Sequence, residues 1–162
     1  MKLYGSLNNR MEENKMYCKE IEVGTGMTRY DYSDRHAYEV VKVIDQTNVF
    51  VREYDHELVG EPMSNQWKLV SNENNTVIEL KLKNGVWYRV IEYTKELWLN
   101  NAKNMAKENT DKIESYYNYC KAMSGLTDKE KEKIENGKAV KKLRKFGNVS
   151  FGVAEYYYDY EF

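Results

Sequence analysis

A change of hydrophobic period divides this chain of 162 residues into three parts. From Glu22 to Tyr93, apolar and polar residues alternate in short runs, which is the pattern of strands with one buried face. From Thr94 the apolar spacing becomes three and four residues, which is the pattern of an amphipathic helix. The closing stretch NVSFGVAEYYYDY alternates again. The fold must therefore combine strands from both parts of the chain with a helical segment between them.

Turn signals divide the first part into five to six short strands. The stretch VGTGMT opens with two glycines and predicts a tight turn that enters a strand. The short connection DQT joins AYEVVKVI to NVFVREYD, and HELVGEPMSNQ is expected to be a loop. Asn84-Gly85 lies between two alternating runs and is the strongest hairpin signal in the chain.

The first of these hairpins allows a trial register. Pairing Val41 and Val43 with the second strand of the hairpin places its valines on one face, because a slip of one residue would turn the apolar set outward. Their partners in this register are Val49 and Val51. The same register places the two histidines of the chain, at positions 36 and 56, opposite each other.

The middle part predicts three helices. Trp98, Ala102 and Met105 share one face of the first helix. Thr110 is the expected N-cap of the second helix, whose apolar stripe is Ile113, Tyr116, Tyr117 and Cys120. Gly125 is expected to end that helix in a left-handed conformation.

The third helix is short. Thr127 and Glu130 form the sequence of a capping box at its start, and Gly137 is expected to stop it. Near the beginning of the chain, Leu7, Met11 and Lys15 have helical spacing and predict a further short helix.

These elements predict an α+β fold in a single domain. We expect a small antiparallel β core, either an SH3-like barrel or a sandwich, made of residues 1–93 and 146–162. Residues 94–145 form a two- to three-helix insertion before the last strand. In this interpretation the closing stretch completes the sheet that the early strands begin.

Composition excludes several classes of protein. A hydrophobic content of 41% with 15 tyrosines excludes a disordered chain. The sequence has no run of about 18 apolar residues, which a membrane-spanning helix would need. The start MKLYGSLNNRMEENK lacks the apolar core of a signal peptide. Cys18 and Cys120 are far apart and are expected to be free thiols. We therefore expect a cytoplasmic protein.

Five cations without an acid between them form the most distinctive charged segment. We call Lys138, Lys141, Lys142, Arg144 and Lys145 the basic run. Residues 1–93 have a net charge of −3 and residues 94–162 a net charge of +2, so the basic run is a local feature. It could steer a partner protein or follow a phosphate backbone.

The tyrosine-rich closing stretch admits two interpretations. Aromatic side chains on a sheet can stack bases, and acids among them would repel phosphate. Strand packing explains the same residues without a ligand, because tyrosine combines an apolar ring with a polar tip. The aromatic residues in question are Phe146, Phe151, Tyr156, Tyr157 and Tyr158.

No motif in the sequence predicts catalysis. His36 and His56 each follow an acid, and a metal site or an acid–base pair there would need further ligands. We expect them instead to lie at the open end of a hairpin. Cys120 lies on an apolar stripe and is expected to be buried and inert. VGTGMT lacks the lysine and the helix of a phosphate-binding loop.

Several stretches, taken in order, resemble a family of small phage and prophage proteins from Firmicutes. They are YGSLNNR, VGTGMT, SDRHAYEV, Met63-Ser64, NGVWY and GVAEYYYDYEF. The resemblance covers residues 1–93 and 146–162. The chain departs from shorter members by the helical segment that begins at Thr94, which looks like an insertion.

The resemblance implies a role in the host cell rather than a reaction. By analogy with other small phage proteins, we expect a non-enzymatic anti-CRISPR protein that binds Cas9 or its guide-loaded form, without a cofactor or a metal. The expected contact surface is the basic run together with Tyr116 or Tyr117, whichever is exposed. The alternatives are a phage nucleic-acid-binding protein that uses the basic run, and a metal enzyme or hydrolase around His36 and His56.

Overall fold

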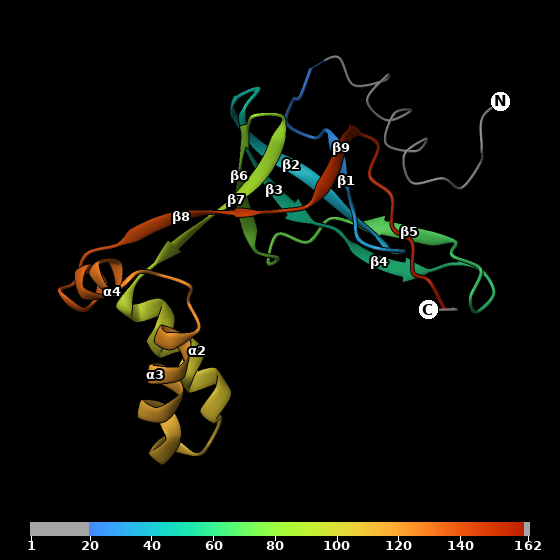
Figure 1. The fold of residues 1–162 in the computed structure, drawn as a ribbon. Helices are drawn as coiled ribbons and strands as arrows, with labels where there is room; N and C mark the ends of the chain where they lie inside the picture. Colours follow the sequence, from blue (N-terminus) through green and yellow to red (C-terminus); the bar gives the residue numbers. More distant parts are fainter. Residues whose placement is uncertain (1–19, 161–162) are drawn as a thin grey trace. The chain divides into compact units, whose positions relative to one another are not determined.

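The computed structural model describes residues 20–160 of the chain, which form strands, α-helices and one 3-10 helix (Figure 1). The α+β class is therefore confirmed, whereas the description of the core as an SH3-like barrel or a sandwich stays a prediction. The expected helix around Leu7, Met11 and Lys15 lies outside the described residues. The strands are β1 (Gly26–Tyr30), β2 (Arg35–Asp45), β3 (Asn48–Glu53), β4 (Asp55–Leu58), β5 (Trp67–Val70), β6 (Val77–Lys83), β7 (Val86–Tyr93), β8 (Val140–Lys145) and β9 (Asn148–Gly152).

Seven of these strands form one sheet in the order β8-β7-β6-β3-β2-β1-β9. The pairs from β7 through to β9 are antiparallel. In the pair of β1 with β9, Met27 lies opposite Phe151. The closing stretch thus lies beside the first strand of the sheet, although the two are more than 100 residues apart in the sequence.

Two turns have the backbone conformations that the sequence predicts. Asn84 and Gly85 join β6 to β7 with φ angles of 52° and 76°. Both angles lie in the left-handed region that a tight hairpin turn requires. Gly24, with a φ of 93°, belongs to the turn before β1. The predicted Asn-Gly hairpin and the predicted turn in VGTGMT are therefore confirmed.

The trial register of β2 with β3 was correct for one pair and wrong for the other. Val43 lies opposite Val49 as expected, but Val40, not Val41, lies opposite Val51. The register shifts between these pairs, so β2 contains a bulge that the alternation of the sequence did not indicate. The expected pairing of residue 36 with residue 56 is wrong as well, because β3 ends at Glu53 and residue 56 belongs to another strand.

The segment expected to be a loop contains β4. Asp55–Leu58 pair with Trp67–Val70 in a separate two-stranded sheet. All four residues of β4 are exposed, so this strand has no buried face that an apolar alternation could indicate. His56 lies opposite Leu69 there, whereas His36 on β2 lies opposite Arg29 of β1.

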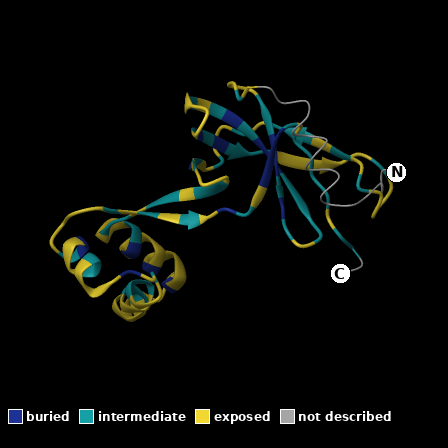
Figure 2. Ribbon diagram, turned by 45° about the horizontal axis from the view of Figure 1, so that its top comes forward, coloured by how far each residue is buried: buried dark blue, intermediate teal, exposed yellow. Residues whose placement is uncertain are grey.

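The described residues divide into two compact units, which are 20–90 with 144–160, and 91–143. In the first unit, the buried apolar side chains come from β1, β2, β3, β6, β9 and the connection that precedes β9. Figure 2 marks the buried residues in dark blue along the ribbon. The core residues of the first unit are Met27, Tyr38, Val40, Val49, Val51, Leu80, Phe146, Val149 and Phe151. The core therefore draws on both sequence-distant parts of the sheet.

The second unit contains α2 (Lys95–Ala106), a 3-10 helix η1 (Thr110–Lys112), α3 (Ile113–Ala122) and α4 (Asp128–Glu135). Its core is smaller and consists of Trp98, Leu126 and Ile134 with half-buried neighbours. Across residues 20–160, every helix is too short or too polar to span a lipid bilayer.

The helices follow the predicted stripes with two corrections. On α2, Trp98 and Ala102 are buried as expected, but Met105 is exposed and Ala106 takes the expected buried place. Thr110 is not the N-cap of α3, because it opens the 3-10 turn and α3 begins at Ile113 without a side-chain cap. A 3-10 turn before an α-helix leaves no sequence signal in an apolar stripe.

The signals around α4 are confirmed. Thr127 Oγ1 accepts from the Glu130 amide at 3.3 Å, and Glu130 Oε1 accepts from the Thr127 amide at 3.0 Å. Gly137 follows the helix with a φ of 87°, and Gly125 has a φ of 72° after α3. Gly125 lies two residues beyond the C-cap Met123, so it is one position later than expected.

The basic run was expected to lead from the helices to the last strand, but most of it is itself a strand. Residues 140–145 form β8 at one edge of the seven-stranded sheet, so two strands follow the helices. Lysines on an edge strand protect it from pairing with other chains. In the sequence, the many cations of this segment concealed that half-buried residues alternate with exposed ones. The half-buried residues are Val140, Lys142 and Arg144.

Candidate functional site

The basic run lies on β8, except for Lys138, which precedes it and is exposed. Successive strand residues point to opposite faces. Lys141 and Lys145 are therefore on one face of β8, where both are exposed, and Lys142 and Arg144 are half-buried on the other. The run presents its cations on two sides of a strand instead of forming one patch of five.

Lys142 of the basic run has a partner on α4. Lys142 Nζ lies 2.8 Å from Glu130 Oε2 of the α4 capping box. The hydrogen bond from Lys142, with that from the Thr127 backbone, lowers the pKa of Glu130 to about 2. Lys142 thus connects β8 to α4 and serves the fold of the second unit.

The two tyrosines expected to supply an aromatic anchor are both half-buried. The Tyr117 hydroxyl donates to Glu135 at 2.9 Å, and its ring meets Trp98 edge to face at 5.9 Å. Burial and the bond to Glu135 raise the pKa of Tyr117 to about 12. Tyr117 is therefore part of the packing between α3 and α4.

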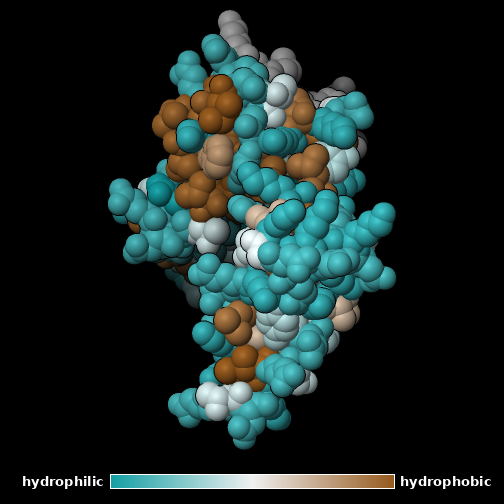
Figure 3. Space-filling view, turned by 90° about the vertical axis from the view of Figure 1, so that its left-hand side faces the viewer, coloured by the Kyte–Doolittle hydropathy of each residue, from teal (hydrophilic) through white to brown (hydrophobic). Residues whose placement is uncertain are grey.

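The exposed apolar side chains of the helices lie at other positions. Tyr119 on α3 is 53% exposed, and Met123, the C-cap of that helix four residues later, is 68% exposed. Figure 3 shows hydrophobic patches on one face of the molecule, among mostly hydrophilic side chains. The stretch YYNYC could have indicated Tyr119, because it falls away from the buried stripe at helical spacing. The full exposed set of this unit is Leu99, Met105, Tyr119, Met123 and Leu143.

Two of the five aromatic residues considered for base stacking belong to the core. Phe146 and Phe151 are 5% and 7% exposed and belong to the core of the first unit. Tyr38 meets the Phe146 ring edge to face at 5.6 Å, and Trp87 packs on Phe151 at 5.1 Å. Neither phenylalanine can stack on a base while the fold is intact, so that part of the nucleic-acid interpretation is wrong.

Tyr156 joins the two histidines that the trial register had paired directly. Its ring stacks on His56 at 3.6 Å, with an interplanar angle of 13°. It also meets Trp67 edge to face at 4.8 Å and His36 at 6.1 Å. Burial and the charge of Asp34 raise the pKa of Tyr156 above its ordinary value. The histidines therefore share an aromatic neighbour instead of facing each other.

His36 has two carboxylates as neighbours. Its Nε2 lies 2.9 Å from Asp31 and its Nδ1 lies 3.6 Å from Glu53. Within residues 20–160, however, no group of three histidine, cysteine or acidic side chains could hold a metal ion. The arrangement makes ion pairs when His36 is protonated, and it leaves neither ring nitrogen directed at an open site.

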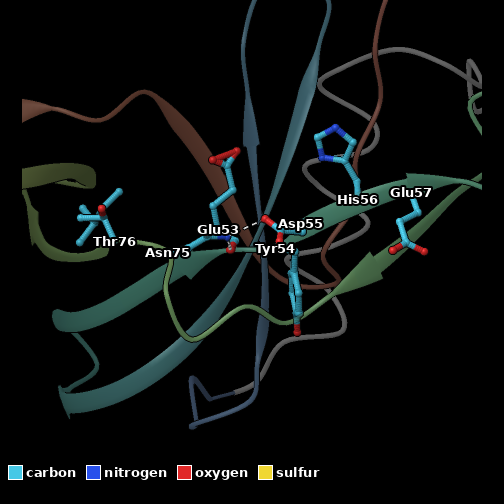
Figure 4. Close-up of a pocket in the computed structure, with 8 residues that line it drawn as sticks. Glu53, Tyr54, Asp55, His56, Glu57, Asn75 and Thr76 are labelled. Atoms are coloured by element: carbon cyan, nitrogen blue, oxygen red, sulfur yellow. Dashed lines mark hydrogen bonds between the residues drawn. The ribbon is translucent and has the colours of Figure 1, made fainter. Parts of the chain in front are cut away.

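A pocket of about 620 Å³ lies beside β4 (Figure 4). Glu53 ends β3, and Asp55 and Glu57 are on β4. Figure 4 shows the Glu53 and Glu57 side chains extending in opposite directions, so the acidic groups do not converge on a point. Asn75 and Asn72 donate to the two oxygens of Asp55 at 2.8 and 2.7 Å and hold the pKa of that carboxyl below its ordinary value. The pocket is lined by Glu53, Tyr54, Asp55, His56, Glu57, Asn75, Thr76 and Ile78.

The cysteine predictions are partly testable. Cys120 is a free thiol and is half-buried, with its Sγ 3.8 Å from Met105 Sδ. The expected full burial of Cys120 is therefore wrong, since the neighbouring Met105 is itself exposed and does not cover the thiol completely. Cys18 lies outside the described residues.

Comparisons of the chain with protein-family models, with curated proteins and with solved structures found no match.

Proposed function

We propose that this protein is a phage-encoded, non-enzymatic inhibitor of host defence that binds its target in the cytoplasm of a bacterial cell. Cas9, alone or loaded with guide RNA, is the target to test first. The proposal rests on the resemblance of the β-strand segments to phage and prophage proteins. It also rests on the surface of the unit formed by residues 91–143.

The observation that carries the proposal is the exposed apolar set of that unit. Tyr119 on α3 and Met123 at the C-cap of this helix are each more than half exposed. Tyrosine and methionine are enriched where proteins bind each other, because a large ring or a flexible thioether fills a partner's pocket. A partner that covered these two side chains would add buried apolar area to a unit whose main cluster has three buried members.

Charge supports a partner with an acidic surface. Residues 91–143 contain 11 lysines and nine acids, a net charge of +2, whereas the described part of the other unit has ten cations and 14 acids, a net charge of −4. Lys138 and Lys141 are exposed, and neither has an ion pair within the described residues. They would increase the rate of association more than the final affinity.

The test is binding and inhibition with purified components. We expect the protein to co-elute with guide-loaded Cas9 and to reduce cleavage of target DNA. The double variant Tyr119→Ala/Met123→Ala should weaken binding at least about 10-fold, as expected for an interface anchor. Tyr32→Ala, an exposed tyrosine of the other unit, is the matched control. If the protein neither co-elutes with Cas9 nor slows cleavage, Cas9 is not its target.

Nucleic-acid binding is the alternative that the exposed lysines favour. Lys138, Lys141 and Lys145 could contact phosphates without any base stacking. This function predicts retardation of DNA or RNA at low salt, with affinity that falls steeply as salt rises. Lys138→Glu/Lys141→Glu would abolish the retardation, whereas Tyr119→Ala/Met123→Ala would leave it unchanged. No retardation at low salt would exclude this alternative.

A further inference from the structure

The hairpin formed by β4, β5 and their connection, residues 55–70, has little support from backbone pairing. Asp55 to Leu58 pair only with Trp67 to Val70, and no described strand of the seven-stranded sheet pairs with either. An isolated two-stranded hairpin is marginally stable in water. Contacts from outside the hairpin must therefore hold it in place.

Residues 153–160, which we call the strap, are firmly attached to the seven-stranded sheet. Arg35 and Tyr157 exchange two backbone hydrogen bonds of 2.9 and 3.0 Å. The Thr28 hydroxyl donates to the carbonyl of Val153 at 2.7 Å and accepts from the amide of Glu155 at 3.0 Å. Thr28 is fully buried, so these bonds are shielded from water.

Two charged side chains add to this attachment. Arg35 Nη1 lies 2.8 Å from Glu155 Oε1, and the Arg35 guanidinium lies over the Tyr157 ring. Asp34 accepts from the amide of Asp159 at 2.7 Å. The strap is thus attached to the sheet at positions along most of its length.

The strap also contacts the hairpin, through Tyr156 and the Tyr158 amide. The Tyr156 ring packs against both strands of the hairpin, on His56 of β4 and on Trp67 of β5. In addition, Asn65 Oδ1 accepts from the Tyr158 amide at 3.0 Å and from Trp67 Nε1 at 2.9 Å. One aromatic ring and one side-chain oxygen therefore connect the hairpin to the strap.

The connection of the hairpin is closely packed and contains two residues in the left-handed region. Met63 and Asn65 have φ angles of 68° and 58°, and the left-handed region is unfavourable for methionine. At Gly60, an added Cβ would lie 2.4 Å from Gln66 Oε1 and 2.7 Å from Ser64 Oγ. The loop is packed closely and carries backbone strain at Met63.

We propose that the strap is a latch, and that the hairpin of residues 55–70 opens and closes on it through the Tyr156 ring. Asp55, held by Asn72 and Asn75 at the base of the hairpin, is the hinge. Because His56 and Glu57 of the hairpin line the pocket of about 620 Å³, opening moves one wall of the pocket. The strap remains on the sheet, since its bonds to Thr28 and Arg35 do not involve the hairpin.

Hydrogen exchange of the full-length protein, followed by mass spectrometry, tests this latch. In Tyr156→Ala, amides of residues 55–70 should exchange at least about 10-fold faster, because the ring contacts to both strands are lost. Amides of residues 37–51, in the centre of the sheet, should exchange at the wild-type rate. Tyr156→Phe, which keeps the ring, should restore wild-type exchange in both segments.

Two further variants make the result specific. Tyr158→Ala removes a ring that is 45% exposed and keeps the backbone bond to Asn65, so it should behave as wild type. Asn65→Gly permits the same φ and removes the oxygen that joins the strap to the hairpin, so it should also release residues 55–70. It gives the decisive comparison should Tyr156→Ala fail to fold.

Unchanged exchange in residues 55–70 of both Tyr156→Ala and Asn65→Gly would overturn the proposal, because the hairpin would then be held without the strap. Faster exchange across residues 37–51 would overturn it too, because Tyr156 would then support the whole sheet.

Discussion

At the scale of single residues, the side chains with the most perturbed acidities serve packing. The raised pKa of Tyr117 arises from burial and from its bond to Glu135. Glu135 in turn lies 3.1 Å from Lys121 and 3.8 Å from Lys95. The carboxylate of Glu135 thus joins α2, α3 and α4, and a perturbed tyrosine here marks a structural junction and not a catalytic acid.

Tyr117→Phe is expected to lower the free energy of unfolding by about 1 kcal/mol at pH 8, because it removes one hydrogen bond to a charged group. The folded pKa of about 12 is above the ordinary value of 10. This contribution is therefore fully present below pH 10 and is lost as the pH rises toward 12. Urea unfolding of both proteins from pH 8 to 12 measures the difference, with Tyr119→Phe as the control. A difference that does not shrink with pH would contradict this role of the hydroxyl.

Gly26→Ala is expected to destabilise the first unit by about 1–3 kcal/mol, because the Cβ of the alanine would lie 2.5 Å from the amide nitrogen of Ala154. The clash is with backbone, so β9 or the strap must shift. The matched control is Gly85→Ala, where nothing lies within 4 Å and only the positive φ of 76° opposes the substitution. It should cost about 1 kcal/mol. Equal costs for the two variants in urea unfolding would show that the close approach of Ala154 is unimportant.

At the scale of elements, α4 shows how a weak helix is fixed at its ends. Its sequence DKEKEKIE has one buried residue, Ile134. A helix of eight residues is marginal by itself. The capping box at Thr127, the pair of Glu130 with Lys142 and the left-handed Gly137 supply what its short apolar face does not.

Thr127→Ala is expected to destabilise the helical unit by about 1 kcal/mol, because it removes a side-chain N-cap. Hydrogen exchange of residues 128–135 measures the effect, and Lys129→Ala, an exposed position, is the control. Equal exchange in Thr127→Ala and Lys129→Ala at pH 7 would contradict the importance of the cap.

The ion pair of Glu130 with Lys142, next to the cap, stabilises the fold over a defined pH range, since Glu130 has a folded pKa of about 2. Its stabilisation is present above the ordinary pKa of 4.5 and disappears as the pH falls toward 2.

At the scale of the whole molecule, residues 20–160 form two cores that share no member. Leu80 is fully buried in the sheet unit and Ile134 is fully buried in the helical unit. The chain crosses between the units twice, within β7 and within β8. Separate cores allow the two units to lose structure separately.

Truncation of either core residue should affect its own unit. We expect Ile134→Ala and Leu80→Ala each to cost about 2–5 kcal/mol. The first should increase hydrogen exchange in residues 95–135 and the second in residues 37–51. Each variant is the control for the other. If Ile134→Ala accelerates exchange of the sheet to the same extent as that of the helices, the two units unfold as one.

Local periodicity determined much of the secondary structure. Alternation in NVFVREYD and TVIELKLK produced β3 and β6, and the left-handed preference of Asn84-Gly85 produced their neighbouring hairpin turn. The helical stripe of α3 and the cap of α4 were equally predictable. These features depend on side chains within a few residues of each other, so they can be predicted from the local sequence.

The candidate surface was less predictable. The basic run was visible in the sequence, but its division over two faces of a strand and the pairing of Lys142 were not. The expected anchors Tyr116 and Tyr117 proved half-buried, and Tyr119 is the exposed ring of α3. Exposure depends on which elements pack on a helix, and the apolar stripe gives only its approximate direction.

By itself, the sequence determined which segments extend, which coil and where several of them turn. Only the tertiary structure decided that β9 lies beside β1, that β2 contains a bulge, and that Tyr156 lies against His56 and Trp67. The physical reason is the range of the interactions. Turn conformations and apolar periods act over a few residues, whereas these contacts join residues that approach each other only after the chain has collapsed around a shared core.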